Sequence, residues 1–259
     1  MKSPIGVYDS GLGGLTVLRA LRARLPAEDF LYFADTRYLP YGDRPESFLR
    51  ERGVAVAAAL VARGCKALVI ACNTATAAAA EPIRAALTQV PVVALEPGVK
   101  PAVAMSQKGV VGVLATTRTL ESPRFRRLLE AHAGATRVVA KACPGLAEAI
   151  EAHGPASDAV QRLLDEYVAA VIEADVVVLG CTHYPWASAA IAARLPVGTQ
   201  LLDTGEAVAR QLERVLHAAG MQGGGSGRLT LATSGIPAAV NEKAARLWGE
   251  RLQVEYWEP

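Results

Sequence analysis

The chain has 259 residues, more than one domain usually holds, and 51% of them are hydrophobic, which is ample for a sizeable core. Its 27 basic and 25 acidic side chains nearly balance and form no long run of one sign, so no nucleic-acid partner is expected. No apolar run approaches the ~20 residues that a membrane span needs, and the first residues lack the apolar core of a signal peptide. We therefore expect a cytoplasmic protein with no membrane partner and with one large or two medium domains.

Strands and helices alternate along the first hundred residues. Strands are predicted at residues 5–8, 30–34, 68–71 and 92–95. Helices are predicted between them at residues 15–25, 45–63 and 75–87. Gly64 is placed as the C-terminal cap of the second helix. This alternation predicts βαβ units around a mostly parallel sheet.

The same rhythm restarts after residues 97–101. Strands are predicted at residues 110–115, 137–140, 176–179 and 200–202, and helices at 123–133, 145–153, 156–174 and once more after Pro185. The last part is predicted to hold a helix at 206–218, a flexible glycine loop at 220–227, a strand at 229–232, a helix at 237–248 and a strand at 252–256. The chain therefore reads as two α/β halves, with a further α/β segment at the end.

Two cysteines follow apolar strands in the same way. Cys181 comes after the run Val176–Gly180 and is followed by Thr-His-Tyr-Pro, and Cys72 comes after Leu68–Ala71 and is followed by Asn-Thr. Ligands of open parallel sheets bind at the carboxyl ends of the strands. A helix that begins after such a cysteine would add N–H groups and a dipole that favour an anion.

Thiols in such positions are suited to proton transfer. A cysteine has a pKa of about 8.5, and a helix N-terminus or a cationic neighbour lowers it toward neutral. One thiolate and one thiol on opposite faces of a ligand would remove a proton from a stereocentre and return one from the other side. The alternative is that each cysteine is a small buried hydrophobe, which we favour for Cys65. No C-x-x-C pair occurs, so neither a structural zinc site nor a thioredoxin-type pair is indicated.

Other polar residues at strand ends could assist the thiols. Asp9 ends the first strand before a glycine-rich turn, where Ser10 and the backbone N–H groups could hold a carboxylate, although Asp9 could equally cap the next helix. His183 lies two residues after Cys181 and could exchange a proton with that thiol. Glu148 and Glu151 lie on a helix face, where a solvated role is expected.

A second motif points to a different class of enzyme. The turn Gly11-Leu12-Gly13-Gly14 follows a strand, and Asp35 ends the next strand, as in a dinucleotide-binding fingerprint. The third glycine of that fingerprint would stand at position 16, which is Thr16. A dinucleotide-dependent oxidoreductase stays an alternative, and so does a binding or regulatory module without catalysis.

Taken together, the motifs resemble those of the glutamate racemase family, within the aspartate/glutamate racemases, which supply D-glutamate for peptidoglycan without a cofactor. The resemblance runs along nearly the whole chain. The matching motifs are Asp9–Gly14, Ala34–Asp35, Pro40–Gly42, Ala71–Ala75, Leu95–Pro97, Thr116 with Thr119, Cys143–Pro144 and Gly180–Pro185.

The resemblance implies that Cys72 and Cys181 are the two acid/base residues. It implies that Asp9 assists Cys72, that His183 assists Cys181, and that Glu151 is a further catalytic helper. No metal or other cofactor is implied. The implied substrate-binding residues are Asp9, Ser10, Tyr41, Gly42, Asn73, Thr74, Thr116, Thr119, Thr182 and His183.

The resemblance also implies two facing, pseudo-symmetric α/β domains with mostly parallel sheets and the active site between them. The first domain would comprise residues 1–97 and 206–259, because the tail returns to it, and the second residues 98–205. The implied substrate is glutamate, with aspartate, the substrate of an aspartate racemase, as the nearest alternative. A homodimer is left open as the assembly.

Overall fold

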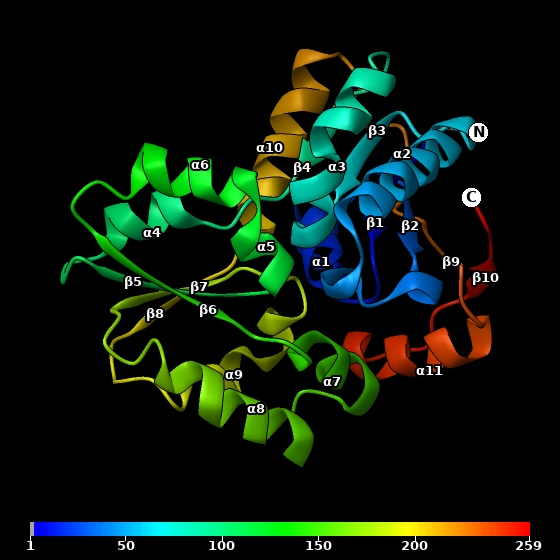
Figure 1. Cartoon of the computed structure of the whole chain (residues 1–259). Helices are drawn as coiled ribbons and strands as arrows, with labels where there is room; N and C mark the ends of the chain where they lie inside the picture. The colour runs from blue at the N-terminus through cyan, green and yellow to red at the C-terminus, as the bar shows by residue number, and fades with distance from the viewer. Residues whose placement is uncertain (1–2) are drawn as a thin grey trace. The chain divides into compact units, whose positions relative to one another are not determined.

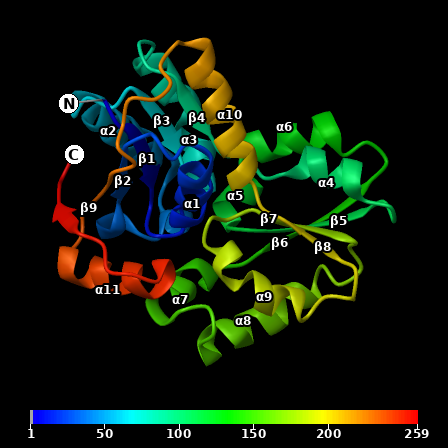
Figure 2. The same cartoon turned by 180° about the vertical axis from the view of Figure 1, so that it is seen from behind.

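The computed structural model describes residues 3–259, which form two compact units, each built on its own parallel sheet (Figures 1 and 2). Unit 1 comprises Met1–Leu95 and Gly205–Pro259, and unit 2 comprises Glu96–Thr204. All strand pairs described in both sheets are parallel, so the predicted α/β class with mostly parallel sheets is confirmed. No helix within residues 3–259 is long and apolar enough to cross a membrane.

The sheet of unit 1 has six strands in the order β10-β9-β2-β1-β3-β4. Its strands are β1 (Ile5–Asp9), β2 (Phe30–Ala34), β3 (Ala67–Ile70), β4 (Val92–Ala94), β9 (Leu229–Thr233) and β10 (Val254–Tyr256). Side chains alternate between the two faces of a strand, yet β1, β2 and β3 are buried at every position. Helices must therefore cover both faces, which explains why these strands read as unbroken apolar runs.

Five α-helices of unit 1 provide this cover. They are α1 (Leu15–Arg24), α2 (Glu46–Ala62), α3 (Asn73–Ala86), α10 (Gly205–Ala218) and α11 (Pro237–Trp248), with short 3₁₀ turns at η1 (Thr36–Tyr38) and η2 (Tyr41–Asp43). Helix α2 packs beside α3, and α1 beside α10. The predicted cap at Gly64 is confirmed, because this residue has a φ of +85° and its N–H donates to the Val61 carbonyl oxygen at 2.8 Å.

The sheet of unit 2 has four strands in the order β6-β5-β7-β8. They are β5 (Val110–Ala115), β6 (Arg137–Ala142), β7 (Val176–Leu179) and β8 (Gln200–Leu202). Its helices are α4 (Val99–Met105), α5 (Thr117–Glu121), α6 (Pro123–His132), α7 (Leu146–His153), α8 (Asp158–Ala169), α9 (Ser188–Ala192) and the 3₁₀ turn η3 (Tyr184–Ala187). Figures 1 and 2 show α4 and α6 on one face of this sheet and α7, α8 and α9 on the other.

Both units share one strand order. The four strands β2-β1-β3-β4 of unit 1 correspond to β6-β5-β7-β8 of unit 2, which supports the internal repeat that the two cysteine motifs suggest. In an order of this kind the chain winds away in opposite directions from the first and third strands. The carboxyl ends of β1 with β3, and of β5 with β7, are therefore the positions where such sheets bind ligands.

Three details differ from the sequence predictions. Helices α4 and α5 were not predicted, because Pro101 interrupts the pattern in one and the other is only one turn long. Proline is tolerated in α4 because it lies in the first turn, where its missing N–H has no helical partner. The glycine loop 220–227 is held in place, since the carboxylates of Glu28 and Asp29 accept hydrogen bonds from its N–H groups at 2.6 and 2.7 Å.

Gly180 follows β7 and packs against β5 with no space for a side chain. A Cβ atom there would lie 2.9 Å from the Ala115 Cβ and 2.9 Å from the Leu114 carbonyl oxygen. We expect Gly180→Ala to lower the free energy of unfolding by about 1–3 kcal/mol, because the crowded atoms must shift. Urea denaturation measures this loss. Adding Ala115→Gly should recover only part of it, since the carbonyl contact remains, and an unchanged stability in the single variant would contradict this packing.

Candidate active site

The Asp9 carboxylate lies at the carboxyl end of β1 and is fully buried. Its Oδ1 accepts a hydrogen bond from the Ser10 N–H at 2.8 Å, and its Oδ2 accepts one from the Gly14 N–H at 2.6 Å. The Tyr32 hydroxyl donates to Oδ2 at 3.3 Å. The N-cap residue of α1 is Gly14, so Asp9 is not the cap of this helix. Instead, N–H groups of the glycine-rich turn hold the Asp9 carboxylate, which agrees with the expectation that this turn can bind a carboxylate.

Cys72 lies two residues after the end of β3 and is the N-cap of α3. The Ala75 N–H donates to its Sγ at 3.4 Å, and the thiol lies 3.6 Å from the Ser10 Oγ. A helix N-terminus stabilises negative charge, so a thiolate at this position is favoured over one in solution. The structure therefore brings Cys72 next to the loop that holds Asp9, and the two belong to one half-site.

Other predicted residues of unit 1 lie around this thiol. Asn73 and Thr74 form the first turn of α3 and are each 5% exposed. The Asn73 Oδ1 is buried without a hydrogen-bond partner in the described structure. Tyr41 is buried in the same apolar cluster as Cys72, and Gly42 follows it in η2. Polar groups from three separate segments are thus gathered at the carboxyl edge of the sheet.

Asp35 was considered as the acidic residue of a dinucleotide fingerprint. Its carboxylate is fully buried and accepts two bonds from Arg52, at 2.7 and 2.9 Å, and one from the Tyr41 hydroxyl at 2.5 Å. A carboxylate held in this way is not available to a ribose hydroxyl. The geometry therefore argues against the oxidoreductase alternative.

Cys181 occupies the equivalent position in unit 2, two residues after the end of β7, and is 7% exposed. Unlike Cys72, it does not cap an α-helix, because the chain continues through His183 into the 3₁₀ turn η3. A helix thus begins directly after Cys72, whereas after Cys181 the first α-helix is α9, which follows Pro185 as the sequence predicts. A different group must tune this second thiol.

That group is the pair His183 and Glu151. The His183 Nδ1 lies 3.8 Å from the Cys181 Sγ, and its Nε2 lies 2.9 Å from the Glu151 Oε2. Burial alone would lower the pKa of His183, but the hydrogen bonds to Cys181 and Glu151 outweigh it and raise this pKa well above its ordinary value. A protonated imidazole at this position donates to Glu151 through Nε2 and toward the Cys181 sulfur through Nδ1.

The solvated role expected for Glu151 is therefore wrong. Glu151 is 1% exposed, and Ala147, one turn earlier in α7, is also buried. The i, i+4 spacing of these two residues was the available signal that Glu151 lies on the buried face of the helix.

The predicted threonines complete the half-site of unit 2. Thr116 is the N-cap of α5 and its Oγ1 lies 3.0 Å from that of Thr119, which is 2% exposed. Thr182 follows Cys181 and is 5% exposed. Since β5 and β7 are neighbours in the sheet, their strand-end residues share one edge. Each unit thus carries half of the predicted set of residues.

The other two cysteines behave differently. Burial raises the pKa of Cys65 and of Cys143 to about 12, so both are neutral thiols near pH 7. This confirms the structural interpretation of Cys65. All four cysteines are free thiols, and residues 3–259 contain no cluster of three His, Cys, Asp or Glu side chains that could hold a metal ion.

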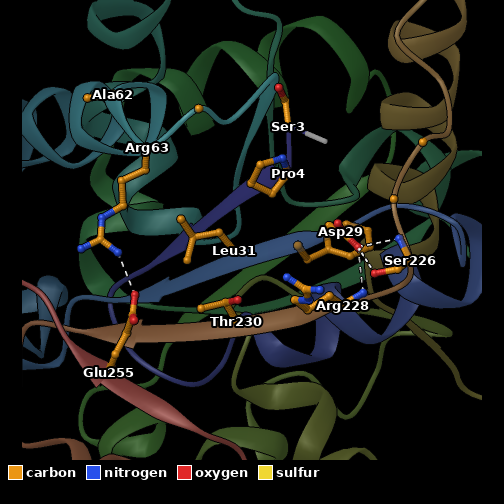
Figure 3. A pocket seen from close by; sticks show the side chains of 14 residues that line it. Ser3, Pro4, Asp29, Leu31, Ala62, Arg63, Ser226, Arg228, Thr230 and Glu255 are labelled. Atoms are coloured by element: carbon orange, nitrogen blue, oxygen red, sulfur yellow. Dashed lines mark hydrogen bonds and ion pairs between the residues drawn. The ribbon is translucent and has the colours of Figure 1, made fainter. Parts of the chain in front are cut away.

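A groove of about 870 Å³ lies at the amino ends of the strands of the unit 1 sheet, opposite to the carboxyl ends where Asp9 and Cys72 lie (Figure 3). Residues at the amino ends of the strands line it, among them Pro4 and Thr230. Three of its charged groups are engaged within the protein, since Arg63 pairs with Glu255 at 2.7 Å and Asp29 accepts bonds from loop N–H groups. Because ligands of open parallel sheets bind at the carboxyl edge, we assign this groove no part in the site.

Two parallel α/β units with the same strand order, each with a buried cysteine at its ligand-binding edge, define the chain as an α/β protein with one thiol site in each unit. The family model for Asp/Glu/hydantoin racemases matches residues 16–212. The chain belongs to this family of racemases, and the resemblance seen in its motifs is confirmed.

Individual relatives agree with this assignment. The glutamate racemase of Pseudomonas paraeruginosa is 46% identical over 255 residues, which cover 97% of this chain and 96% of that protein. The crystal structure of glutamate racemase isoform RacE1 from Bacillus anthracis matches with a TM-score of 0.90 and 30% identity, over 100% of this chain and 98% of that one. The Escherichia coli glutamate racemase, in complex with L-glutamate and the activator UDP-MurNAc-ala, matches with a TM-score of 0.86 and 29% identity, over 98% and 97% of the two chains.

The raised pKa of His183 leads to a prediction about pH. A histidine whose pKa is raised on folding stabilises the folded state. For His183 this stabilisation is fully present below the pKa of the unfolded chain, about 6.5, and is lost as the pH rises through the higher pKa of the folded protein. Glu151→Gln removes a negative charge from His183, so its pKa should fall and the loss should occur at a lower pH. NMR titration of the ¹⁵N-labelled imidazole measures the shift, with the other three histidines as internal controls. A pKa of His183 that is unchanged in Glu151→Gln would contradict the role of this contact.

Proposed function

We propose that this protein interconverts L- and D-glutamate by proton transfer at Cα, with Cys72 and Cys181 as the two acid/base groups and without a cofactor. The observation that carries this proposal is the pair of buried thiols at equivalent strand ends of two similar units. Membership of the racemase family and 46% identity to a glutamate racemase support the choice of reaction and substrate.

The chemistry requires one thiolate and one thiol on opposite faces of a single substrate. The thiolate takes the Cα proton, the C–H bond breaks, and its electron pair is delocalised into the neighbouring carboxylate. The thiol then gives its proton to the opposite face of Cα, which inverts the centre. Each turnover leaves the two cysteines with exchanged protonation states, so the opposite reaction starts from the product state.

In the first half-site, Cys72 is held ready by its helix and by the Asp9 loop. The N-terminus of α3 favours its thiolate, and the Ser10 hydroxyl lies beside the sulfur. The Asp9 Oδ1 lies 3.4 Å from that hydroxyl. We propose that Asp9 assists Cys72 through Ser10, by holding the Ser10 N–H and hydroxyl beside the sulfur.

In the second half-site, His183 assists Cys181. Its raised pKa keeps the imidazole protonated, so it donates toward the sulfur and lowers the cost of a thiolate. Glu151 holds the other ring nitrogen and fixes the orientation of the ring. We propose that Glu151 acts on Cys181 only through His183.

The substrate's carboxylates would be bound by hydroxyl and N–H donors at these strand ends. In unit 1 the proposed groups are those of Ser10, Asn73 and Thr74, with the backbone N–H groups of Tyr41 and Gly42 in the neighbouring loop. In unit 2 they are those of Thr116, Thr119, Thr182 and His183. The N-terminal turn of α3 suits a carboxylate because its N–H groups have no partner within the helix.

Aspartate is the nearest alternative substrate, and the comparisons favour glutamate. Polarimetry on each pure enantiomer of glutamate and aspartate tests the choice. We expect the rotation of both glutamate enantiomers to decay to zero, and that of aspartate to change at least about a hundredfold more slowly, because a shorter side chain leaves bound polar groups unpaired. Faster racemisation of aspartate would refute the proposed substrate.

Variants of the two cysteines test the proposed roles. A positioned acid or base typically contributes ~10²–10⁴-fold, so Cys72→Ala and Cys181→Ala should each reduce kcat at least by this factor. Cys65→Ala is the matched control, since it removes a buried thiol just before the amino end of β3, the opposite end of the strand from Cys72, and it should retain kcat. Racemisation at the wild-type rate by both site variants would rule out the two-thiol mechanism.

Serine at one site should affect the two directions unequally. A hydroxyl can still donate a proton but is a far weaker base than a thiolate, so each Cys→Ser variant should lose most in the direction in which its residue is the base. Initial rates from L- and D-glutamate, measured separately for Cys72→Ser and Cys181→Ser, should show opposite biases. Equal slowing of both directions in both variants would contradict the division of roles.

The cellular setting and the assembly are also proposals. We propose that the protein acts in the cytoplasm and that its D-glutamate supplies peptidoglycan synthesis, as its family suggests. A homodimer, which the sequence leaves open, stays a prediction that analytical ultracentrifugation would test.

A further inference from the structure

A buried charge network in unit 1 has no part in the proposed proton transfer. Asp35 is fully buried after β2, and Arg52 of α2 is 9% exposed. The Nε and Nη2 atoms of Arg52 donate to the two oxygens of Asp35 at 2.9 and 2.7 Å. Two parallel bonds of this kind fix the orientation of both groups, which a single ammonium could not do.

The network continues from Asp35 toward the half-site of Cys72. The Tyr41 hydroxyl donates to the Asp35 Oδ2 at 2.5 Å, and the Tyr8 hydroxyl lies 2.6 Å from that of Tyr41. Burial raises the pKa of Tyr8, and the negative charges of Asp35 and, more weakly, of Cys72 raise it further. The hydroxyls of Tyr41 and Tyr8 therefore link the Arg52–Asp35 pair to the surroundings of the Cys72 thiol. Tyr41 is also a residue that the proposed function assigns to substrate binding.

The same guanidinium also holds the end of the chain. Its Nη1 donates to the Pro259 carbonyl oxygen at 3.0 Å, and its Nη2 lies 3.2 Å from the Glu258 Oε1. Glu258 in turn pairs with Arg37 at 3.3 Å and accepts a bond from the Tyr38 hydroxyl at 3.3 Å. Figures 1 and 2 both show the end of the chain beside α2. Arg52 thus contacts two segments at once, the loop of residues 36–44 with its anchor Asp35, and the tail of residues 254–259.

We propose that Arg52 is a positioning residue for substrate binding, which sets the loop 36–44 by holding Asp35 and by fixing the tail 254–259 against that loop. The inference rests on the proposed function, because that function places Tyr41 and Gly42 at the substrate. The contacts of Arg52 are with the loop and the tail, so its loss acts on substrate affinity and leaves the proton-transfer step intact.

A second arginine provides the matched control. Arg63, at the end of α2, pairs with Glu255 at 2.7 Å and stacks over the Trp257 ring at 4.2 Å. It holds the same tail, but its partners are in the tail and not in the loop 36–44. If the tail of residues 254–259 contributed only to stability, replacing Arg52 or Arg63 would have the same effect on KM.

The test compares Arg52→Lys with Arg63→Lys in steady-state kinetics on both glutamate enantiomers. Arg52→Lys keeps the charge and loses the two parallel bonds, so KM should rise about tenfold in both directions, the loss of roughly one charge-assisted hydrogen bond, with kcat within about twofold of wild type. Arg63→Lys should leave KM unchanged. Hydrogen exchange should speed up across residues 36–44 in Arg52→Lys and stay at the wild-type rate in Arg63→Lys.

The possible outcomes separate the claims. An active wild type with unchanged KM and unchanged exchange in Arg52→Lys would overturn the positioning role, and so would an equal rise of KM in both variants. A wild type that does not racemise glutamate would refute the proposed function, while exchange in residues 36–44 would still decide whether Arg52 holds the loop. If Arg52→Lys does not fold, Glu258→Gln gives the same readout with a smaller expected rise in KM, about twofold to threefold, and an unchanged KM there would count against the proposal.

Discussion

The parallel pairing of a first strand with a third strand is the constraint on which the thiol site of each unit depends. In unit 1, β1 lies beside β3 with Tyr8 opposite Ile70, and in unit 2, β5 lies beside β7 with Leu114 opposite Leu179. Parallel neighbours end at the same edge of a sheet, so residues far apart in the sequence are gathered there. Close packing enforces the arrangement, since the backbone of Gly180 touches β5 where a side chain would not fit.

The two thiols share a position in the fold but differ in their electrostatic surroundings. Cys72 caps a helix and receives an N–H hydrogen bond from Ala75, so fixed backbone dipoles favour its charged form. Cys181 has no such helix and depends on a titratable partner, His183, whose proton is held by Glu151. The two thiols therefore contact different groups, backbone N–H dipoles at Cys72 and a His–Glu pair at Cys181.

Most of the strands and helices could be predicted from the sequence, because apolar runs form the strands and glycines and prolines mark where they end. The positions of Cys72 and Cys181 could be predicted because each follows a strand end. The charged residue Glu151 was misjudged for one physical reason, its burial by tertiary packing. Glu151 in α7 lies on the buried face of its helix, where its charge had suggested exposure, and Arg52 in α2, for which the sequence contains no signal, is also buried. Their partners, His183 and Asp35, are distant in sequence, so periodicity could not reveal the pairs.

The central claim is that one substrate meets two separate proton carriers. The most direct measurement is the position of solvent deuterium after less than one turnover, with each glutamate enantiomer incubated in D₂O and its Cα analysed by mass spectrometry after chiral separation. Two separate carriers predict deuterium in the inverted product from the first turnover and protium in the recovered substrate, because the thiol that returns a proton is not the one that removed it. Equal deuterium in recovered substrate and product, or product that retains the original protium, would indicate a single carrier and contradict the account.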